Sequence, residues 1–127
     1  MAYGTLQTDV INSSTGLFST NNAYSGIAKA WVAFTGSTIN GSFNVSSITV
    51  NAAGDYTINF TTAMPNANYA MAGAAQIDTG NTAAGLLAVT IGRWTSNPST
   101  TALRISVVSS ANSATAPSLA TVAVFSS

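Results

Sequence analysis

Short runs of β-branched and aromatic residues alternate with clusters of glycine, asparagine, proline and serine along most of this chain. Such runs and breaks are typical of β-strands joined by turns. No window shows apolar residues at i, i+3, i+4 and i+7, the spacing of an amphipathic helix. The sequence therefore predicts an all-β protein. We expect strands over residues 28–34, about 43–50, 55–61, 69–77, 86–95, 101–109 and 119–125.

Two hairpins are expected in the first half of the chain. Within residues 35–41, the Asn40–Gly41 pair is a strong signal for the turn of the first hairpin. The second hairpin joins residues 43–50 to residues 55–61, where apolar and polar positions alternate with a period of two. Its inward-facing side chains are expected to be Tyr56, Ile58 and Phe60.

The parity of the apolar positions changes inside the strand expected near residues 43–50. Phe43 and Val45 share one parity, whereas Ile48 and Val50 share the other. One extra residue in the strand would restore both pairs to the same side, so the pattern predicts a β-bulge near Ser46–Ser47.

The strand expected over residues 69–77 is unusually small in its side chains, with four alanines and one glycine. Small residues allow the backbone of another element to come close. Two interpretations remain open at this point. The strand lies beside a neighbouring subunit, or it lies under a large aromatic residue such as Trp31 or Trp94.

Short strands with regularly spaced turns predict the architecture. Residues 27–127 are expected to form a single β-sandwich or jelly-roll-like domain. Residues 1–26 show no sustained period, and we expect them to form an extended N-terminal arm that packs on its own domain or on a neighbour.

Composition narrows the possible functions. The chain has no histidine, cysteine or glutamate, three aspartates, and three residues that are lysine or arginine. Most general bases and transition-metal ligands belong to the missing types, so we expect a structural or binding protein and not an enzyme. Three cations cannot neutralise the phosphates of a nucleic-acid footprint, and no apolar run is long enough for a membrane helix. Net charge of zero favours association into an oligomer.

The aspartates are the only candidate ligands for a hard cation. Asp78 with Thr79, Asn81 and loop carbonyls resembles a weak Ca²⁺ site, but such a site needs six to eight oxygens. An aspartate beside glycine or threonine more commonly bonds the backbone of a turn, and we favour that interpretation, above all for Asp55. We therefore expect no metal and no cofactor. The few charges are expected to pair within an oligomer, where Arg93 or Arg104 meets an aspartate of a neighbour.

Each tryptophan stands close to a cation, Trp31 near Lys29 and Trp94 beside Arg93. Tryptophan stacks on sugar faces and is frequent at interface hot spots, so these pairs are candidate contact patches. The favoured interpretation is a core tryptophan whose neighbouring cation extends to solvent. The candidate surface-recognition residues are Trp31, Asn81, Trp94 and Asn97.

Four motifs in order carry a resemblance to a known group of proteins. They are IAKAWVAF at 27–34, GSFNVSSIT at 41–49, GDYTINF at 54–60 and AMPNANYA at 63–70, preceded by AYGTL at 2–6. Together they resemble a module in structural proteins of tailed bacteriophages, especially those of cyanobacteria and other aquatic bacteria. That module occurs at the distal ends of tail fibres and tailspikes and as short free-standing virion proteins.

The resemblance implies a trimeric β-sandwich on the outer surface of a virion, made in the host cytoplasm. Because the chain starts at Met1 and has no shaft repeat, we favour a capsid cement (decoration) protein bound to the major capsid protein. The alternative is the distal receptor-binding domain of a tail fibre or tailspike, which recognises a host surface polysaccharide or protein. In the cement interpretation the arm makes capsid or trimer contacts. Its candidate contact residues are Leu6, Val10, Ile11, Leu17 and Phe18.

Overall fold

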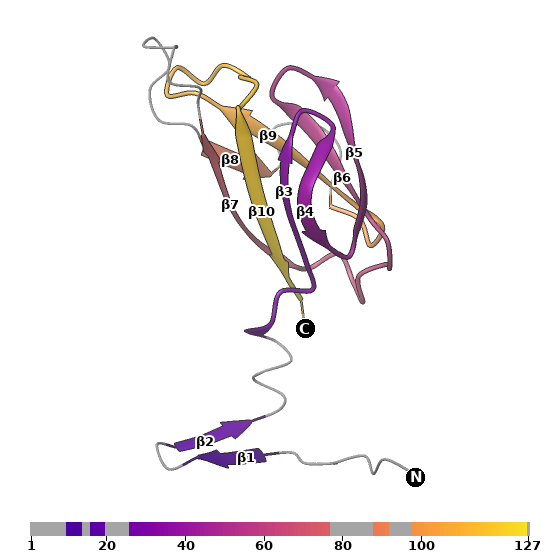
Figure 1. The fold of residues 1–127 in the computed structure, drawn as a ribbon, viewed down its shortest axis with the longest axis vertical. Helices are drawn as coiled ribbons and strands as arrows, with labels where there is room; N and C mark the ends of the chain where they lie inside the picture. Colours follow the sequence, from indigo (N-terminus) through magenta and orange to yellow (C-terminus); the bar gives the residue numbers. More distant parts are fainter. Residues whose placement is uncertain (1–9, 14–15, 20–25, 77–87, 92–97, 127) are drawn as a thin grey trace.

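The computed structural model describes residues 10–13, 16–19, 26–76, 88–91 and 98–126 (Figure 1). The secondary-structure elements within these residues are all β-strands, which confirms the prediction of an all-β protein. The strands are β1 (Val10–Ser13), β2 (Gly16–Ser19), β3 (Ala30–Thr35), β4 (Thr38–Phe43), β5 (Val45–Ala52), β6 (Asp55–Phe60), β7 (Ala70–Gln76), β8 (Ala88–Ile91), β9 (Ala102–Val108) and β10 (Leu119–Phe125).

Eight of these strands form two four-stranded antiparallel sheets that pack face to face as a β-sandwich (Figure 1). One sheet has the strand order β4-β3-β10-β7 and the other has the order β5-β6-β9-β8. Period-two alternation directs one side of each strand into the space between the sheets. The largest buried apolar side chains there are Val32, Phe34, Tyr56, Ile58, Leu103, Ile105, Val107 and Val124.

The core joins the two sheets through an aromatic pair. The rings of Phe34 in β3 and Tyr56 in β6 meet edge to face, with centroids 5.2 Å apart and an interplanar angle of 68°. Tyr56, Ile58 and Phe60 are all buried, as the alternation in the second hairpin predicts. This arrangement of the aromatic quadrupoles is favourable and adds to the stabilisation from burial.

The first hairpin turns within the predicted range of residues 35–41, but not at the Asn–Gly pair. Its strands β3 and β4 are joined by Gly36 and Ser37, and Gly36 has a φ of 57°, in the left-handed region that glycine adopts without strain. Asn40 and Gly41 lie inside β4, where the register with β3 shifts between Ala33 and Phe34. The prediction that the Asn–Gly pair makes the turn is therefore wrong, because Gly36 supplies the left-handed residue and the pair accompanies a β-bulge instead.

The predicted bulge in β5 is confirmed. Val45 is opposite Phe60, whereas Ser47 is opposite Asn59, so Ser46 is the extra residue. The bulge returns Ile48 to the side of Val45, and both side chains are buried.

Asn44 forms the corner at which the chain leaves the first sheet and enters the second. It is the single residue between β4 and β5, and its φ is 55°. Its side-chain amide donates to the carbonyl oxygens of Lys29 and Thr62, each at 3.1 Å, and its Oδ1 accepts from the Thr62 backbone N–H at 2.7 Å. Asparagine suits this corner because it tolerates the left-handed conformation and bonds the backbone on both sides.

Replacing Asn44 with alanine is expected to lower the free energy of unfolding by about 2 kcal/mol or more, since three hydrogen bonds are lost and alanine is strained at positive φ. Urea unfolding of the purified protein measures this. Asn44→Gly is the matched control, because it loses the same hydrogen bonds without the backbone strain, and we expect a smaller loss. A wild-type free energy of unfolding for Asn44→Ala would contradict the role of this corner.

The segment predicted as an extended arm contains a hairpin that the sequence did not predict. Strands β1 and β2 pair in antiparallel register, with Val10 opposite Ser19 and Ser13 opposite Gly16. A two-stranded hairpin alone is marginally stable in water. The remainder of residues 1–25 lies outside the described residues, so the extended arm and its boundary at residue 26 stay predictions.

Candidate functional site

The four strands of the β4-β3-β10-β7 sheet contain no charged residue, and Lys29 directly precedes β3. The residues that alternate outward from the three adjoining strands β3, β10 and β7 are mostly small and apolar. They include Trp31, Ala33, Thr121, Ala123, Ala72 and Ala74.

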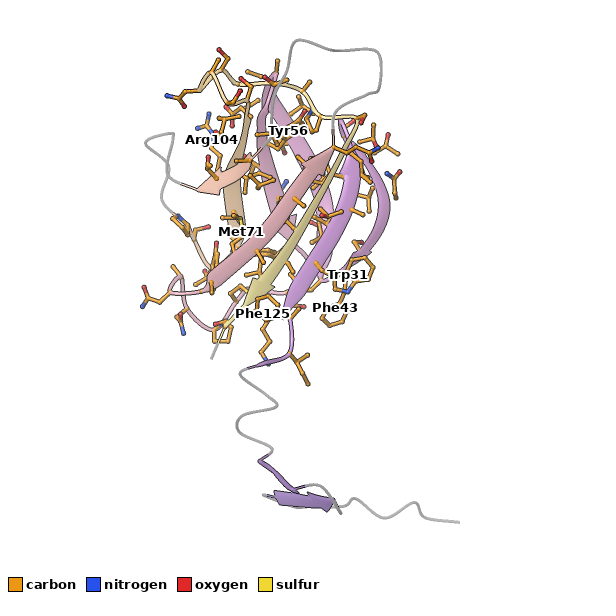
Figure 2. The ribbon with its side chains drawn as sticks, turned by 90° about the vertical axis from the view of Figure 1, so that its left-hand side faces the viewer. Trp31, Phe43, Tyr56, Met71, Arg104 and Phe125 are labelled. Carbon is orange, nitrogen blue, oxygen red and sulfur yellow. The ribbon has the colours of Figure 1, made fainter. Side chains whose placement is uncertain are left out.

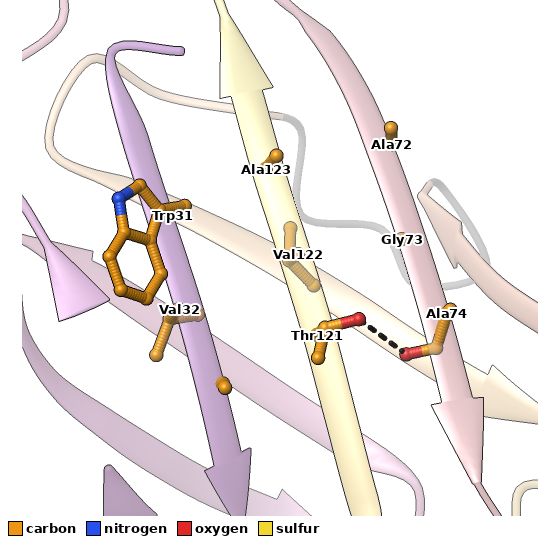
Figure 3. Close-up of a pocket in the computed structure, with 9 residues that line it drawn as sticks. Trp31, Val32, Ala72, Gly73, Ala74, Thr121, Val122 and Ala123 are labelled. Atoms are coloured by element: carbon orange, nitrogen blue, oxygen red, sulfur yellow. Dashed lines mark hydrogen bonds between the residues drawn. The ribbon is translucent and has the colours of Figure 1, made fainter. Parts of the chain in front are cut away.

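These residues line a shallow depression of about 540 Å³ (Figure 3). Its floor is made by Ala72, Ala74, Thr121 and Ala123, and Trp31 borders it on the β3 side. The Thr121 hydroxyl donates to the backbone carbonyl of Ala74 at 3.4 Å, the dashed line in Figure 3. The polar group on the floor is therefore already satisfied within the chain.

An aromatic ridge, defined here as Trp31 and Phe43, stands beside the depression. The two residues are cross-strand partners in β3 and β4 and project together from the sheet (Figure 2). Trp31 is 44% exposed and Phe43 is 56% exposed. A Cβ on Gly41 would lie 3.5 Å from Trp31 Cζ3, so the indole ring rests over this glycine.

The interpretation of Trp31 as a core residue is wrong. Ala30, Val32 and Phe34 take the inward positions of β3, which leaves the outward parity to Trp31. No described element covers the indole ring fully. Phe43 was missed by the sequence analysis, although its place directly before the corner residue Asn44 is a signal that could have found it.

The small residues of β7 serve two purposes. Gly73 faces the other sheet, where an added Cβ would lie 3.0 Å from both Cβ and Cγ1 of Val89. The absence of a side chain there lets β7 lie close to β8. Ala72 and Ala74 alternate to the other side and line the depression that Trp31 borders. The remaining interpretation, a neighbouring subunit beside β7, stays a prediction.

A buried ion pair lies on the other sheet. Asp55 is 2% exposed, and both of its oxygens accept from Arg104, with Nη2–Oδ2 at 2.6 Å and Nε–Oδ1 at 2.9 Å. Asn51 Nδ2 also donates to Oδ1, at 3.2 Å. The hydrogen bonds from Arg104 hold the pKa of Asp55 below its ordinary value of 3.8; burial opposes this and Asn51 adds to it.

Two predictions about charges are therefore wrong. Asp55 was expected to bond the backbone of its turn, and Arg93 or Arg104 was expected to meet an aspartate of a neighbouring copy. The two residues pair within one chain instead, because the antiparallel ladder of β6 and β9 places Arg104 opposite Thr57, two residues from Asp55. A bidentate pair of this kind binds the two strands together.

This pair makes the stability of the fold depend on pH. The folded chain holds the Asp55 proton more weakly than the unfolded chain, so the stabilisation is complete above pH 3.8 and is lost as the pH falls toward the lower pKa of the folded state. Urea unfolding at a series of acidic pH values measures the loss. Asp55→Asn removes this titration, and its free energy of unfolding is expected to fall less steeply with acid. Equal slopes for both proteins would contradict the assignment.

Several residues expected to form sites lie outside the described residues. They are Leu6, Asp9, Asp78, Asn81, Arg93, Trp94 and Asn97. Val10, Ile11, Leu17 and Phe18 lie in β1 and β2, and their capsid or trimer contacts stay predictions. In the part of the chain that is described, no three acidic, histidine or cysteine side chains are grouped to hold a metal ion. No helix within the same residues is long and apolar enough to cross a membrane.

Comparison of the chain with protein-family models, with curated proteins and with solved structures finds no significant match. The resemblance to phage virion modules stays a prediction from the sequence motifs between residues 27 and 70. What the geometry of the site offers is an uncharged apolar surface with a projecting ridge, a surface suited to contact with another macromolecule.

Proposed function

We propose that this chain is a structural protein on the outer surface of a tailed-phage virion, where it acts as a trimeric capsid cement protein bound to the major capsid protein. The observation that carries an assembly function is the uncharged sheet face with the exposed Trp31 and Phe43. The phage assignment comes from the sequence motifs. We propose no catalytic role, since the chain has no histidine, cysteine or glutamate.

A cement protein stabilises a shell by covering apolar surface on several subunits at once. Each Å² of apolar surface removed from water contributes roughly 25 cal/mol, and no charged group is required. Exposed aromatic side chains in an apolar patch mark surfaces that are covered by a partner. In this function the arm, residues 1–26, grips the capsid shell, and the sandwich domain forms the outer body of the trimer.

The position and copy number of the protein in purified virions test this function. Quantitative mass spectrometry gives the copy number, and cryo-electron microscopy gives the position. Many copies distributed over the shell are the expected result. A few copies confined to the tail would overturn the cement function and favour a fibre tip.

A deletion tests the role of the arm separately. Removing residues 2–20 is expected to abolish co-sedimentation of the purified protein with capsids assembled without this protein, because the arm is proposed to hold the shell. The sandwich domain should keep its cooperative melting transition. Unchanged capsid binding by the shortened chain would show that the arm is not the gripping element.

The half-exposed Trp31 favours one second candidate, the distal receptor-binding domain of a tail fibre or tailspike. Tryptophan faces stack on sugar rings, so a host surface polysaccharide or a glycosylated protein fits this candidate. Purified protein would then label host cells and compete with phage adsorption, and Trp31→Ala would abolish both effects. Wild-type protein that does neither would eliminate this candidate.

A further inference from the structure

The aromatic ridge and the depression lie on the same sheet face and have complementary shapes. The ridge projects two large rings, whereas the floor of the depression carries alanines and Thr121. A volume of about 540 Å³ falls within the range of small-ligand pockets and is ample for one aromatic side chain. One surface therefore supplies both the projecting part and the receiving part of a contact.

The face can be dehydrated at low cost. The backbone groups of its two central strands, β3 and β10, are paired on both sides in the antiparallel ladders. The Thr121 hydroxyl already donates to the carbonyl of Ala74. Burying the face leaves none of these groups without a partner, whereas unpaired buried polar groups cost about 1–3 kcal/mol each.

The chemistry of the face selects its partner. A sugar or a charged ligand requires converging polar side chains, and the floor offers only the hydroxyl of Thr121, which is already engaged. A charged protein surface would lose hydration against the face without gaining an ion pair. A second copy of this chain brings an uncharged face with a matching ridge, so like copies meet without electrostatic repulsion.

We infer that this face binds a second copy of the chain, with the ridge of Trp31 and Phe43 of one copy seated in the depression of the other. The inference rests on the proposed function, in which the chain works as an oligomer. In a trimer each copy places its ridge in the next copy and receives the ridge of the previous one. Such a head-to-tail contact closes into a ring of three when neighbouring copies are related by a threefold rotation.

The area of this sheet face sets the expected affinity between two copies. Four strands of six or seven residues, spaced about 4.8 Å apart with about 3.4 Å per residue, give a footprint of roughly 450 Å² per copy. About 900 Å² in total is at the low end for specific interfaces. The association through this face alone is therefore expected to depend on concentration in the micromolar range.

Sedimentation velocity of the full chain over micromolar concentrations tests the inference. Ala74→Arg places a charge on the floor of the depression, and Trp31→Ala removes the main ring of the ridge. Each is expected to raise the dissociation constant about 30-fold or more, as for an interface hot spot. Val50→Arg is the matched control, because Val50 is 47% exposed on β5 of the other sheet, and it should associate like the wild type.

A mixing experiment separates the ridge-in-depression contact from other uses of the same face. Trp31→Ala keeps the floor of the depression (Ala72, Ala74, Thr121 and Ala123) although it shortens the β3 border, and Ala74→Arg keeps the ridge. An equimolar mixture should therefore form mixed dimers although neither variant associates alone. A fluorescent label on one variant detects them. Trp31 is exposed, so Trp31→Ala decides the outcome even if Ala74→Arg fails to fold.

The outcomes distinguish the inference from the proposed function. Wild-type association by both variants, a monomeric wild type, or equal loss in Val50→Arg would overturn the inference and leave capsid binding to be judged by the deletion of residues 2–20. A wild-type dimer that the two variants disrupt would support the docking face and overturn the trimer of the proposed function.

Discussion

Replacing Gly54 with alanine is expected to remove most of the folding stability of this protein. Gly54 has a φ of 71°, and a Cβ at this position would lie 2.4 Å from the backbone nitrogen of Thr115 and 2.7 Å from the carbonyl oxygen of Val107. Both contacts are with backbone atoms, which cannot rotate away as a side chain can. The Val107 N–H also donates to the Gly54 carbonyl at 2.8 Å, so the two segments are held together from both sides.

We expect a loss of about 4 kcal/mol or more for Gly54→Ala. Overpacking typically costs about 1–3 kcal/mol, and the left-handed conformation adds about 1–2 kcal/mol for a residue with a Cβ. The total free energy of unfolding of a natural domain is only about 5–15 kcal/mol. The variant should therefore be largely unfolded, or have a melting temperature far below that of the wild type. Urea unfolding and thermal melting measure this.

Two other glycines separate the causes. Gly36 has a φ of 57° but no atom within 4 Å of an added Cβ, so Gly36→Ala should show the backbone cost alone, about 1–2 kcal/mol. Gly26 has neither constraint, and Gly26→Ala should change stability by less than about 1 kcal/mol. A Gly54→Ala protein as stable as Gly36→Ala would contradict the tight packing of Thr115 on this turn.

Replacing Asp55 with alanine is expected to have the second-largest effect. Breaking a buried pair by removing one partner costs about 3–5 kcal/mol, because the remaining charge is left without compensation. The Arg104 side chain is 26% exposed and can be partly solvated, so we expect the free energy of unfolding to fall by about 3 kcal/mol. Urea unfolding at neutral pH, where the carboxylate is ionised, measures the difference.

A double-mutant cycle assigns this loss to the pair. Asp55→Ala, Arg104→Ala and the double variant should give a coupling free energy of about 1–3 kcal/mol. Ser106→Ala is the matched control: Ser106 is opposite Asp55 in the β6–β9 ladder, and its buried hydroxyl has no hydrogen-bond partner among the described residues. Its removal should be neutral or stabilising. Additive effects of the two single variants would show that the contact contributes no coupling.

Local patterns were sufficient where burial follows from spacing along one strand. The alternation of Tyr56, Ile58 and Phe60 predicts the inner side of β6, and the change of parity before Ile48 predicts the bulge at Ser46. These features depend on residues a few positions apart, because a strand turns alternate side chains to opposite sides. Composition concerns which side chains exist at all, and the prediction of contact with other macromolecules rather than catalysis rests on it.

Features that join distant segments were not predictable from local patterns. The partner of Asp55 stands 49 positions later in the chain, and the backbone that makes Gly54 irreplaceable belongs to residues 107 and 114–115. The outer sheet face is assembled from strands β3, β7 and β10, which are far apart in sequence and become neighbours only through the strand order. Whether Trp31 is buried or exposed depends on this order as well. The alternation in β3 allows either side to face the core, and the position of the second sheet selects the side of Val32 and Phe34 and leaves the tryptophan to a partner or to solvent.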